Sequence, residues 1–114
     1  MTDKAKPVAT GYHAHVYFDA ASRDKAWALR ERVGKALPVA VGRFHEKPVG
    51  PHPRFSFQVA FTPEQFSTVV PWLMLNRDGL TVFLHPETGD ALTDHAERAL
   101  WMGEIWPLNL DALR

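Results

Sequence analysis

Strict alternation of apolar and polar side chains is the feature of this sequence that most constrains its fold. Residues 54–61 place a large apolar side chain at every second position, so all of these side chains leave one face of a strand. They are Phe55, Phe57, Val59 and Phe61. Residues 12–19 alternate in the same way, with Tyr12, Ala14, Val16 and Phe18 on one side and His13, His15 and Tyr17 on the other. A sheet of such strands needs cover on one face and leaves the other face open.

Two segments with helical spacing can supply that cover. Ser22 can cap the first, whose apolar residues recur every three or four positions until Pro38 stops the helix. These residues are Ala26, Leu29, Val33 and Leu37. The second segment begins at residues 62–65, Thr-Pro-Glu-Gln, which join a capping Thr, a Pro at the first helical position and a Gln at the capping-box position. Its buried residues are Phe66, Val69, Val70 and Leu73, while Pro71 is predicted to kink or end it and Gly79 fits a terminator.

Two further strands complete a known order of elements. Val39 to Phe44 predicts a short second strand, and Leu80 to His85 predicts the fourth. The order is β-α-β-β-α-β with a C-terminal tail from Pro86, which is the split βαβ arrangement of an α+β, ferredoxin-like sandwich. We expect a mobile N-terminal tail over residues 1–10 and one domain over residues 11–114.

The composition agrees with this fold and excludes several classes of protein. With 46% apolar residues the chain can bury a core, and the absence of Cys excludes disulfides and thiolate metal sites. Thirteen basic residues balance thirteen acidic ones, so we expect no nucleic-acid or membrane partner. The uncharged stretch Gln65 to Asn76 is shorter than the roughly 20 residues of a spanning helix, and residues 1–10 lack the apolar core of a signal peptide. The sequence therefore predicts a cytoplasmic protein.

Three of the six histidines are predicted to meet on the open face. His13 and His15 lie two positions apart on one strand, so their imidazoles leave the same face with Cα atoms about 7 Å apart. In this topology the fourth strand lies antiparallel beside the first, which brings His85 next to His13. If Val82 and Leu84 face the core, His85 shares the open face with the other two. The sequence thus predicts a metal site of His13, His15 and His85, and the alternative is a set of ordinary hydrogen-bonded histidines on an exposed sheet.

A second candidate lies in the loop from His45 to Pro53. Its three prolines within residues 48–53 make the loop stiff, which would hold His52 in place as an acid–base group. The alternative is a stiff hairpin connection in which this histidine is incidental.

The C-terminal tail contributes polar and apolar candidates. Asp94-His95 is predicted to open a short helix that carries Leu100 and Trp101, with Asp94 as its N-cap. The apolar tail residues need cover, either over the open face or on a second subunit. They are Trp101, Trp106 and Leu108.

Four segments together resemble the DOPA 4,5-dioxygenase family over roughly residues 11–106. They are residues 12–18 (Tyr-His-Ala-His-Val-Tyr-Phe), the loop 45–53, residues 85–90 (His-Pro-Glu-Thr-Gly-Asp) with Asp94-His95, and residues 99–104 (Ala-Leu-Trp-Met-Gly-Glu). The resemblance implies a ferredoxin-like fold and extradiol opening of a catechol ring, that of L-DOPA or a related catechol, by a non-haem metal and O₂.

This reaction assigns expected roles to the histidines. His13, His15 and His85 would hold the metal, His52 would act as general base or acid, and His45 and His95 are the alternates for that role. Fe(II) is the expected metal with O₂ as co-substrate, and it is usually bound by two His and one carboxylate. The candidate carboxylates, Glu46, Asp90 and Asp94, all fall outside the predicted open face. A site of histidines alone would also accept Zn²⁺ or Ni²⁺.

Three other functions compete with this one. An RNA-recognition domain needs exposed aromatic residues on its third strand, whereas the aromatic residues at 55–61 all alternate to the core side. A ferredoxin-like homodimer that binds a metal or an aromatic ligand without catalysis would bind catechol and consume no O₂. A Zn²⁺-assisted hydrolase would be active whether or not oxygen is present. The open face and the apolar tail predict a homodimer in any of these cases.

Overall fold

The computed structural model describes residues 7–114, so most of the predicted N-terminal tail, residues 1–6, lies outside the described residues. The strands in this range are β1 (Gly11–Phe18), β2 (Ala40–Val41), β3 (Phe55–Phe61), β4 (Thr81–Glu87) and β5 (Leu100–Met102). The helices are α1 (Arg23–Ala36), α2 (Phe66–Asn76) and α3 (Ala91–Ala96), and the 3₁₀ turns are η1 (Pro63–Gln65) and η2 (Leu110–Leu113). No helix among these residues is both long and apolar enough to cross a membrane.

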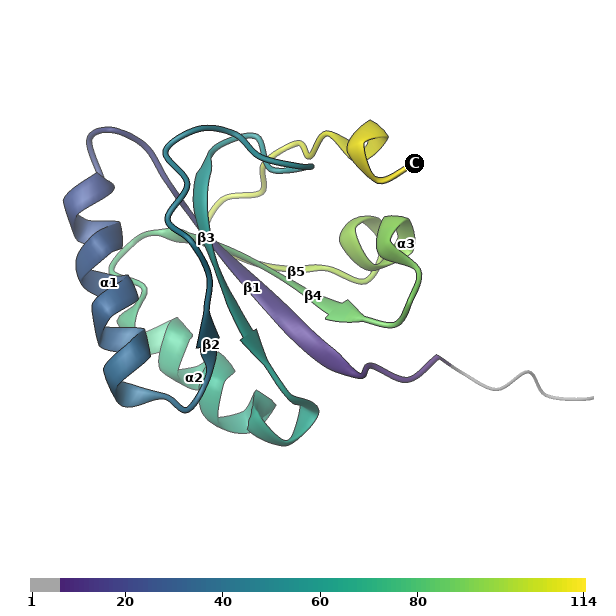
Figure 1. Ribbon diagram of the computed structural model, residues 1–114, viewed down its shortest axis with the longest axis horizontal. Helices are drawn as coiled ribbons and strands as arrows, with labels where there is room; N and C mark the ends of the chain where they lie inside the picture. Colours follow the sequence, from purple (N-terminus) through teal and green to yellow (C-terminus); the bar gives the residue numbers. More distant parts are fainter. Residues whose placement is uncertain (1–6) are drawn as a thin grey trace, which may run out of the picture.

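The strands form one antiparallel sheet in the order β2-β3-β1-β4-β5. The first four give the order expected of a ferredoxin-like sandwich, and β5 extends the sheet beyond β4. In Figure 1, α1 and α2 lie on one side of the sheet, while α3 and the C-terminal turn lie on the other. The α+β, ferredoxin-like prediction is therefore confirmed.

One face of the sheet forms the core with α1 and α2. Its strands contribute Ala14, Val16, Phe18, Phe57, Val59, Phe61, Val82 and Leu84, and the helices contribute Ala26, Leu29, Val33, Val69, Val70 and Leu73. The alternation predicted for residues 12–19 and 54–61 is confirmed, as is the condition that Val82 and Leu84 face the core. His85 consequently points to the opposite face, as do the other odd-numbered residues of β4.

Two predictions for the middle of the chain need correction. The second strand was predicted over residues 39–44, but β2 contains two residues. Beyond it, the backbone N–H of Gly42 donates to the carbonyl of Gln58, and His45 pairs with Ser56 in an isolated bridge. Helix α2 does not end at Pro71. It runs on to Asn76. Pro71 has no N–H to donate to the carbonyl of Ser67, but both residues lie on the exposed side of the helix, so water can bind that carbonyl.

The segment after β4 also differs from prediction. Helix α3 begins at Ala91, where the side chain of Asp90 caps it by accepting a hydrogen bond from the backbone N–H of Thr93. Asp94 is therefore not the N-cap, because Asp90 fills that role one turn earlier. Leu100 and Trp101 are not helical either, since they belong to β5 and pair with β4. A three-residue strand is too short to show a period in the sequence.

The loop 46–54 and the C-terminal tail lie over the open face of the same chain. The backbone N–H of Asn109 donates to the carbonyl of Pro51 over 2.9 Å, which joins the two segments. The guanidinium of Arg54 lies 3.8 Å from the ring centre of Trp106. Trp101 packs against Phe83, with ring centres 4.6 Å apart. The sequence allowed the apolar tail to pack on the open face or on a second subunit, and in the structure it packs on the open face of its own chain.

Candidate active site

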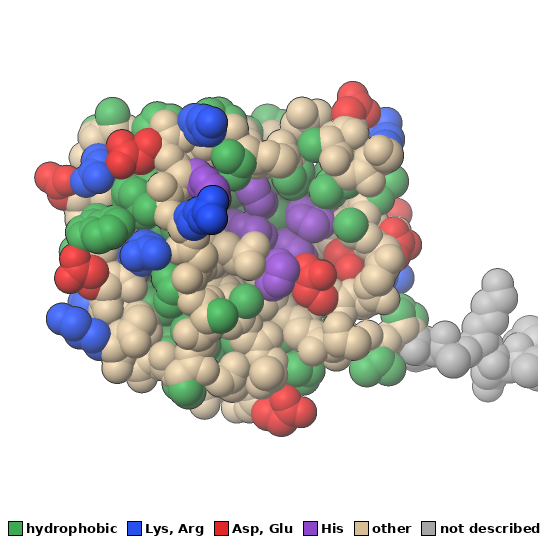
Figure 2. All heavy atoms as spheres, viewed as in Figure 1, with side chains coloured by type: hydrophobic (Ala, Val, Ile, Leu, Met, Phe, Trp, Pro, Cys, Tyr) green, Lys and Arg blue, Asp and Glu red, His purple; other side chains and the backbone are tan. Residues whose placement is uncertain are grey.

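Five histidine rings gather where β1 and β4 lie side by side on the open face. The register pairs His13 with His85, and His15, two residues further along β1 and on the same face, pairs with Phe83. The Nε2 atoms of His15 and His85 lie 3.0 Å apart, and one ligand atom from each of His13, His15 and His85 lies within 4.8 Å of the others. Figure 2 shows the histidine side chains together in a hollow of this face. These three residues can therefore hold a metal ion, as the sequence predicted.

The hydrogen bonds of His85 prepare it to bind a metal. Its Nδ1 lies 3.0 Å from the carbonyl oxygen of Pro86, so Nδ1 carries the proton and donates it. The lone pair is then on Nε2, which faces His15. Histidines that bind metals usually donate their other N–H to a carbonyl or carboxylate in this way. A separation of 3.0 Å between two Nε2 atoms also agrees with ligands that lie about 2.0–2.1 Å from one ion.

Glu87 is a carboxylate at this site that the sequence reasoning missed. Its Oε1 lies 3.1 Å from Nδ1 of His13 and 3.5 Å from Nδ1 of His85. The strand was predicted to end at His85 because Pro86 follows, but β4 continues to Glu87. The signal was present in the period of two, which puts residues 85 and 87 on one face.

The three carboxylates considered from the sequence have other partners. Glu46 forms an ion pair with Arg23 over 2.9 Å, and Asp90 caps α3. Asp94 is buried, where it accepts hydrogen bonds from the backbone N–H and the hydroxyl of Thr88 and pairs with Arg98 over 3.0 Å. Asp94 thus fixes the turn after β4, and these interactions occupy it there.

His52 reaches the cluster from the proline-rich loop. Its ring centre lies 4.1 Å from that of His15, and its Nδ1 lies 2.8 Å from the hydroxyl of Tyr17. Tyr17 is 2% exposed, and burial raises the pKa of its phenol, so the hydroxyl keeps its proton. A protonated hydroxyl can donate to Nδ1 or accept from it, so the pair allows either tautomer of His52. The Nε2 atom is left for another partner.

The two alternate histidines occupy different positions. The ring of His95 lies 3.8 Å from that of His85, and its Nδ1 donates to the carbonyl of Ala91 over 2.7 Å. His95 therefore belongs to the cluster. His45 lies further out, where it lines a small cavity of about 80 Å³ together with His15 and His52.

Burial keeps the central imidazoles neutral at neutral pH. It lowers the pKa of His52 and of His85 to about 4, with the neighbouring histidines adding to the shift in each case. The pKa of His15 is lowered well below its usual value, first by burial and then by His52 and His85. A metal binds the neutral form of imidazole, so protons compete weakly for these ligand atoms at pH 7.

Comparison with known proteins agrees with the site geometry. The model of the Dopa 4,5-dioxygenase family matches residues 12–112, which include all five histidines of the cluster. The chain belongs to this family.

Three proteins similar to this chain come from two fungi and a cyanobacterium. An uncharacterized 21.2 kDa protein of Botryotinia fuckeliana is 39% identical over 90% of this chain and 63% of its own length. A DOPA 4,5-dioxygenase of Amanita muscaria is 36% identical over 87% of this chain and 47% of its own length. The chain thus spans about half to two thirds of these fungal proteins. The crystal structure of a candidate dioxygenase from Nostoc punctiforme is 57% identical, with a TM-score of 0.90, and the match covers 92% of this chain and 91% of that one.

Proposed function

We propose that this protein is a metal-dependent extradiol dioxygenase that opens the ring of L-DOPA or a related catechol with O₂. One observation carries the proposal: His13, His15 and His85 present ligand atoms within 4.8 Å of one another on the open face of the sheet. Family membership supports the reaction class, since the Amanita muscaria relative is a DOPA 4,5-dioxygenase.

The donor set fits a redox-active divalent metal. Neutral imidazole nitrogens and a carboxylate are the ligands of non-haem Fe(II) in oxygenases. We assign His13, His15 and His85 as the nitrogen ligands, and Glu87, which lies at Nδ1 of His13 and of His85, as a carboxylate that orients these rings. When bound, Fe(II) supplies the Lewis acidity for the catechol oxygens and the electrons that make O₂ reactive. The same ligands would also accept Zn²⁺ or Ni²⁺ from solution.

His52 is the proposed proton-transfer group. A catechol must lose a proton as its oxygens bind, and a base needs a free lone pair at neutral pH. With its pKa lowered to about 4, His52 is neutral there, and Nε2 can accept the proton while Nδ1 donates to Tyr17. The resulting imidazolium can later return this proton from Nε2. Tyr17 thus holds the ring of His52 in place through both stages.

Trp101 beside the cluster would contact the substrate ring. It packs on Phe83, whose ring is 0% exposed and lies under the site, 5.8 Å from the ring centres of His15 and His95. Phe83 therefore supports the site from below, whereas the partly exposed indole of Trp101 can offer a stacking contact to a flat ring.

Oxygen uptake is the decisive experiment. Protein loaded with Fe(II) without air is mixed with L-DOPA and a panel of catechols, and O₂ consumption is followed together with absorbance. We expect one O₂ per catechol and a new yellow product, both lost in His15→Ala. His45→Ala is the matched control, since it removes a histidine outside the ring contacts and should keep its metal.

The failure of this experiment would also be informative. Catechol that binds to the metal-loaded protein without O₂ uptake would contradict the enzyme and favour a non-catalytic binding protein. Activity that does not depend on oxygen would instead favour a metal-assisted hydrolase. We also expect a homodimer, and a monomeric mass in light scattering at micromolar concentration would contradict that expectation.

A further inference from the structure

A groove between α3 and the C-terminal tail adjoins the histidine cluster at His95. This groove has a volume of about 250 Å³. Its lining includes His95, Trp101, Ile105, Trp106, Leu108 and Leu110. His95 is the link to the cluster, because its ring also lies 3.8 Å from that of His85. The groove is therefore the neighbouring space that a substituent on a ring at the cluster would reach past His95.

The lining of this groove offers no oppositely charged side chain to a charged substituent. Among the described residues that line it there is no Lys, Arg, Asp or Glu. Instead Ile105, which is 77% exposed, presents an apolar side chain on its rim. An ionic group gains nothing from such walls and loses part of its hydration there, whereas an apolar chain gains by leaving water.

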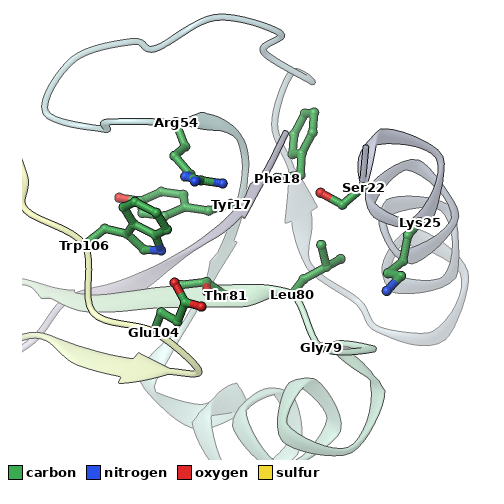
Figure 3. Close-up of a pocket in the computed structure, with 10 residues that line it drawn as sticks. All are labelled: Tyr17, Phe18, Ser22, Lys25, Arg54, Gly79, Leu80, Thr81, Glu104 and Trp106. Carbon is green, nitrogen blue, oxygen red and sulfur yellow. The ribbon is translucent and has the colours of Figure 1, made fainter. Parts of the chain in front are cut away.

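A charged cavity does exist nearby, but aromatic side chains separate it from the cluster. It has a volume of about 180 Å³, and it is lined by Lys25 and Arg54 as well as Glu104. Figure 3 shows Arg54, Tyr17 and Trp106 together on one side of this cavity and Lys25 with Ser22 on the other. Trp106 lines both the cavity and the groove, so its ring lies between them. Tyr17 lines the cavity and its hydroxyl contacts His52, so its buried ring separates the cavity from the cluster.

The third space at the cluster is smaller than the groove and more polar. The cavity beside His15 and His52 has a volume of about 80 Å³, and Ser56 and Gln58 give it a polar lining. The groove at His95 is thus the larger of these two spaces and the one with apolar walls, which suits an apolar substituent of several atoms.

We propose that the groove is the subsite for the ring substituent of the substrate, and that it selects catechols with an uncharged apolar chain over catechols with an amino-acid side chain. This inference rests on the proposed function, because it takes the catechol to be bound at the histidine cluster. The residues that decide the preference are Ile105, Leu108 and Trp106.

The test compares two ligands with the same three-carbon chain, 4-propylcatechol and L-DOPA. Their affinities for the metal-loaded protein are measured by calorimetry without air, so the readout does not require turnover. We expect 4-propylcatechol to bind roughly tenfold more tightly or better, since its chain is buried without loss of ionic hydration. Ile105→Arg should reduce this ratio about fivefold or more, because the new guanidinium attracts the carboxylate of L-DOPA and covers apolar surface.

The control is Leu75→Arg, which adds the same charge at a position that is 86% exposed on α2, away from the open face. It should leave the ratio unchanged. Equal affinities for the two catechols would overturn the inference. Tighter binding of L-DOPA that Arg54→Ala weakens would also overturn it and move recognition to the charged cavity. If neither catechol binds, the proposed function fails as well, so the two failures are distinguishable.

Discussion

The two faces of the sheet are made of alternate residues of the same strands, but they are stabilised in different ways. On the helix side, Val16, Phe57 and Val82 are fully buried among apolar neighbours. On the open side, His15 and His85 are nearly as buried, at 5% and 1% exposed, but among polar rings. The first face gains free energy from burial, whereas the second loses the hydration of its imidazoles and recovers part of it in hydrogen bonds.

This difference indicates where stability and function are separated in the molecule. A substitution on the helix side should change the free energy of unfolding and leave the metal site intact. A substitution on the histidine side should change metal binding by a large factor and stability by less. Each of the following predictions tests this separation, from the largest expected effect to the smallest.

Removal of a metal ligand should have the largest effect. His85→Ala is expected to lose bound metal and to lower turnover by about 1000-fold or more, a loss of about 4 kcal/mol of transition-state stabilisation, because two neighbouring imidazoles cannot replace the third. Metal content by elemental analysis and catechol turnover are the measurements. His45→Ala should retain its metal. If His15→Ala and His85→Ala both keep one metal per chain, the assignment of these ligands is wrong.

The next effect belongs to the apolar face. Phe57 is 0% exposed, so Phe57→Ala should lower the free energy of unfolding by about 3–5 kcal/mol through lost burial and the cavity left behind. Gln58→Ala, one residue along the same strand but on the open face, should cost less than about 1 kcal/mol. Urea unfolding followed by circular dichroism compares the two. Equal costs at the two positions would remove the contrast between the faces.

The pH dependence of the metal-free protein should report on the histidine face. In the unfolded chain a histidine has a pKa near 6.5, whereas His52 and His85 have pKa values of about 4 in the folded protein. Between these values the unfolded state binds more protons, so stability is complete above pH 6.5 and is lost as the pH falls towards 4. We expect a loss of about 2 kcal/mol for each such histidine between pH 7.5 and 5.

Urea unfolding at these two pH values, after removal of metal with a chelator, measures that loss. His52→Gln should show a smaller loss than the parent chain, because one depressed pKa is gone. A stability that stays constant from pH 7.5 to 5 would mean that the buried rings are not held neutral.

The sequence could predict most of the fold because a period of two residues also decides which face a side chain joins. The alternation over 54–61 fixed the core side of β3, and the pairing of β1 with β4 followed from the order of elements. That pairing was enough to place His13, His15 and His85 together. Strong local patterns and a known topology thus carried the prediction from residues to the cluster.

The missed parts depend on interactions that no local pattern shows. A strand can contain a proline where no neighbouring strand needs its N–H. Strand β5 pairs with β4 only over residues 82–84, so Pro86 has no partner on that side, and β4 continues to Glu87. The three residues of β5 have no strong preference of their own, and their pairing with β4 makes them extended. The contact of His95 with His85 depends in turn on where Asp90 starts α3.

The smallest effect we predict concerns the start of the second helix, far from the histidines. The side chain of Gln65 accepts a hydrogen bond from the backbone N–H of Thr62 over 2.9 Å and donates one to the carbonyl of Pro38 over 2.6 Å. Gln65→Ala should therefore lower the free energy of unfolding by about 1 kcal/mol, as loss of a helix cap does. The exposed neighbour Glu64 provides the control, since Glu64→Ala removes neither bond. Metal content should be unchanged in both variants, because the helix side and the histidine side share the sheet but not these contacts. A loss of metal in Gln65→Ala would show that the two faces are coupled through the strands.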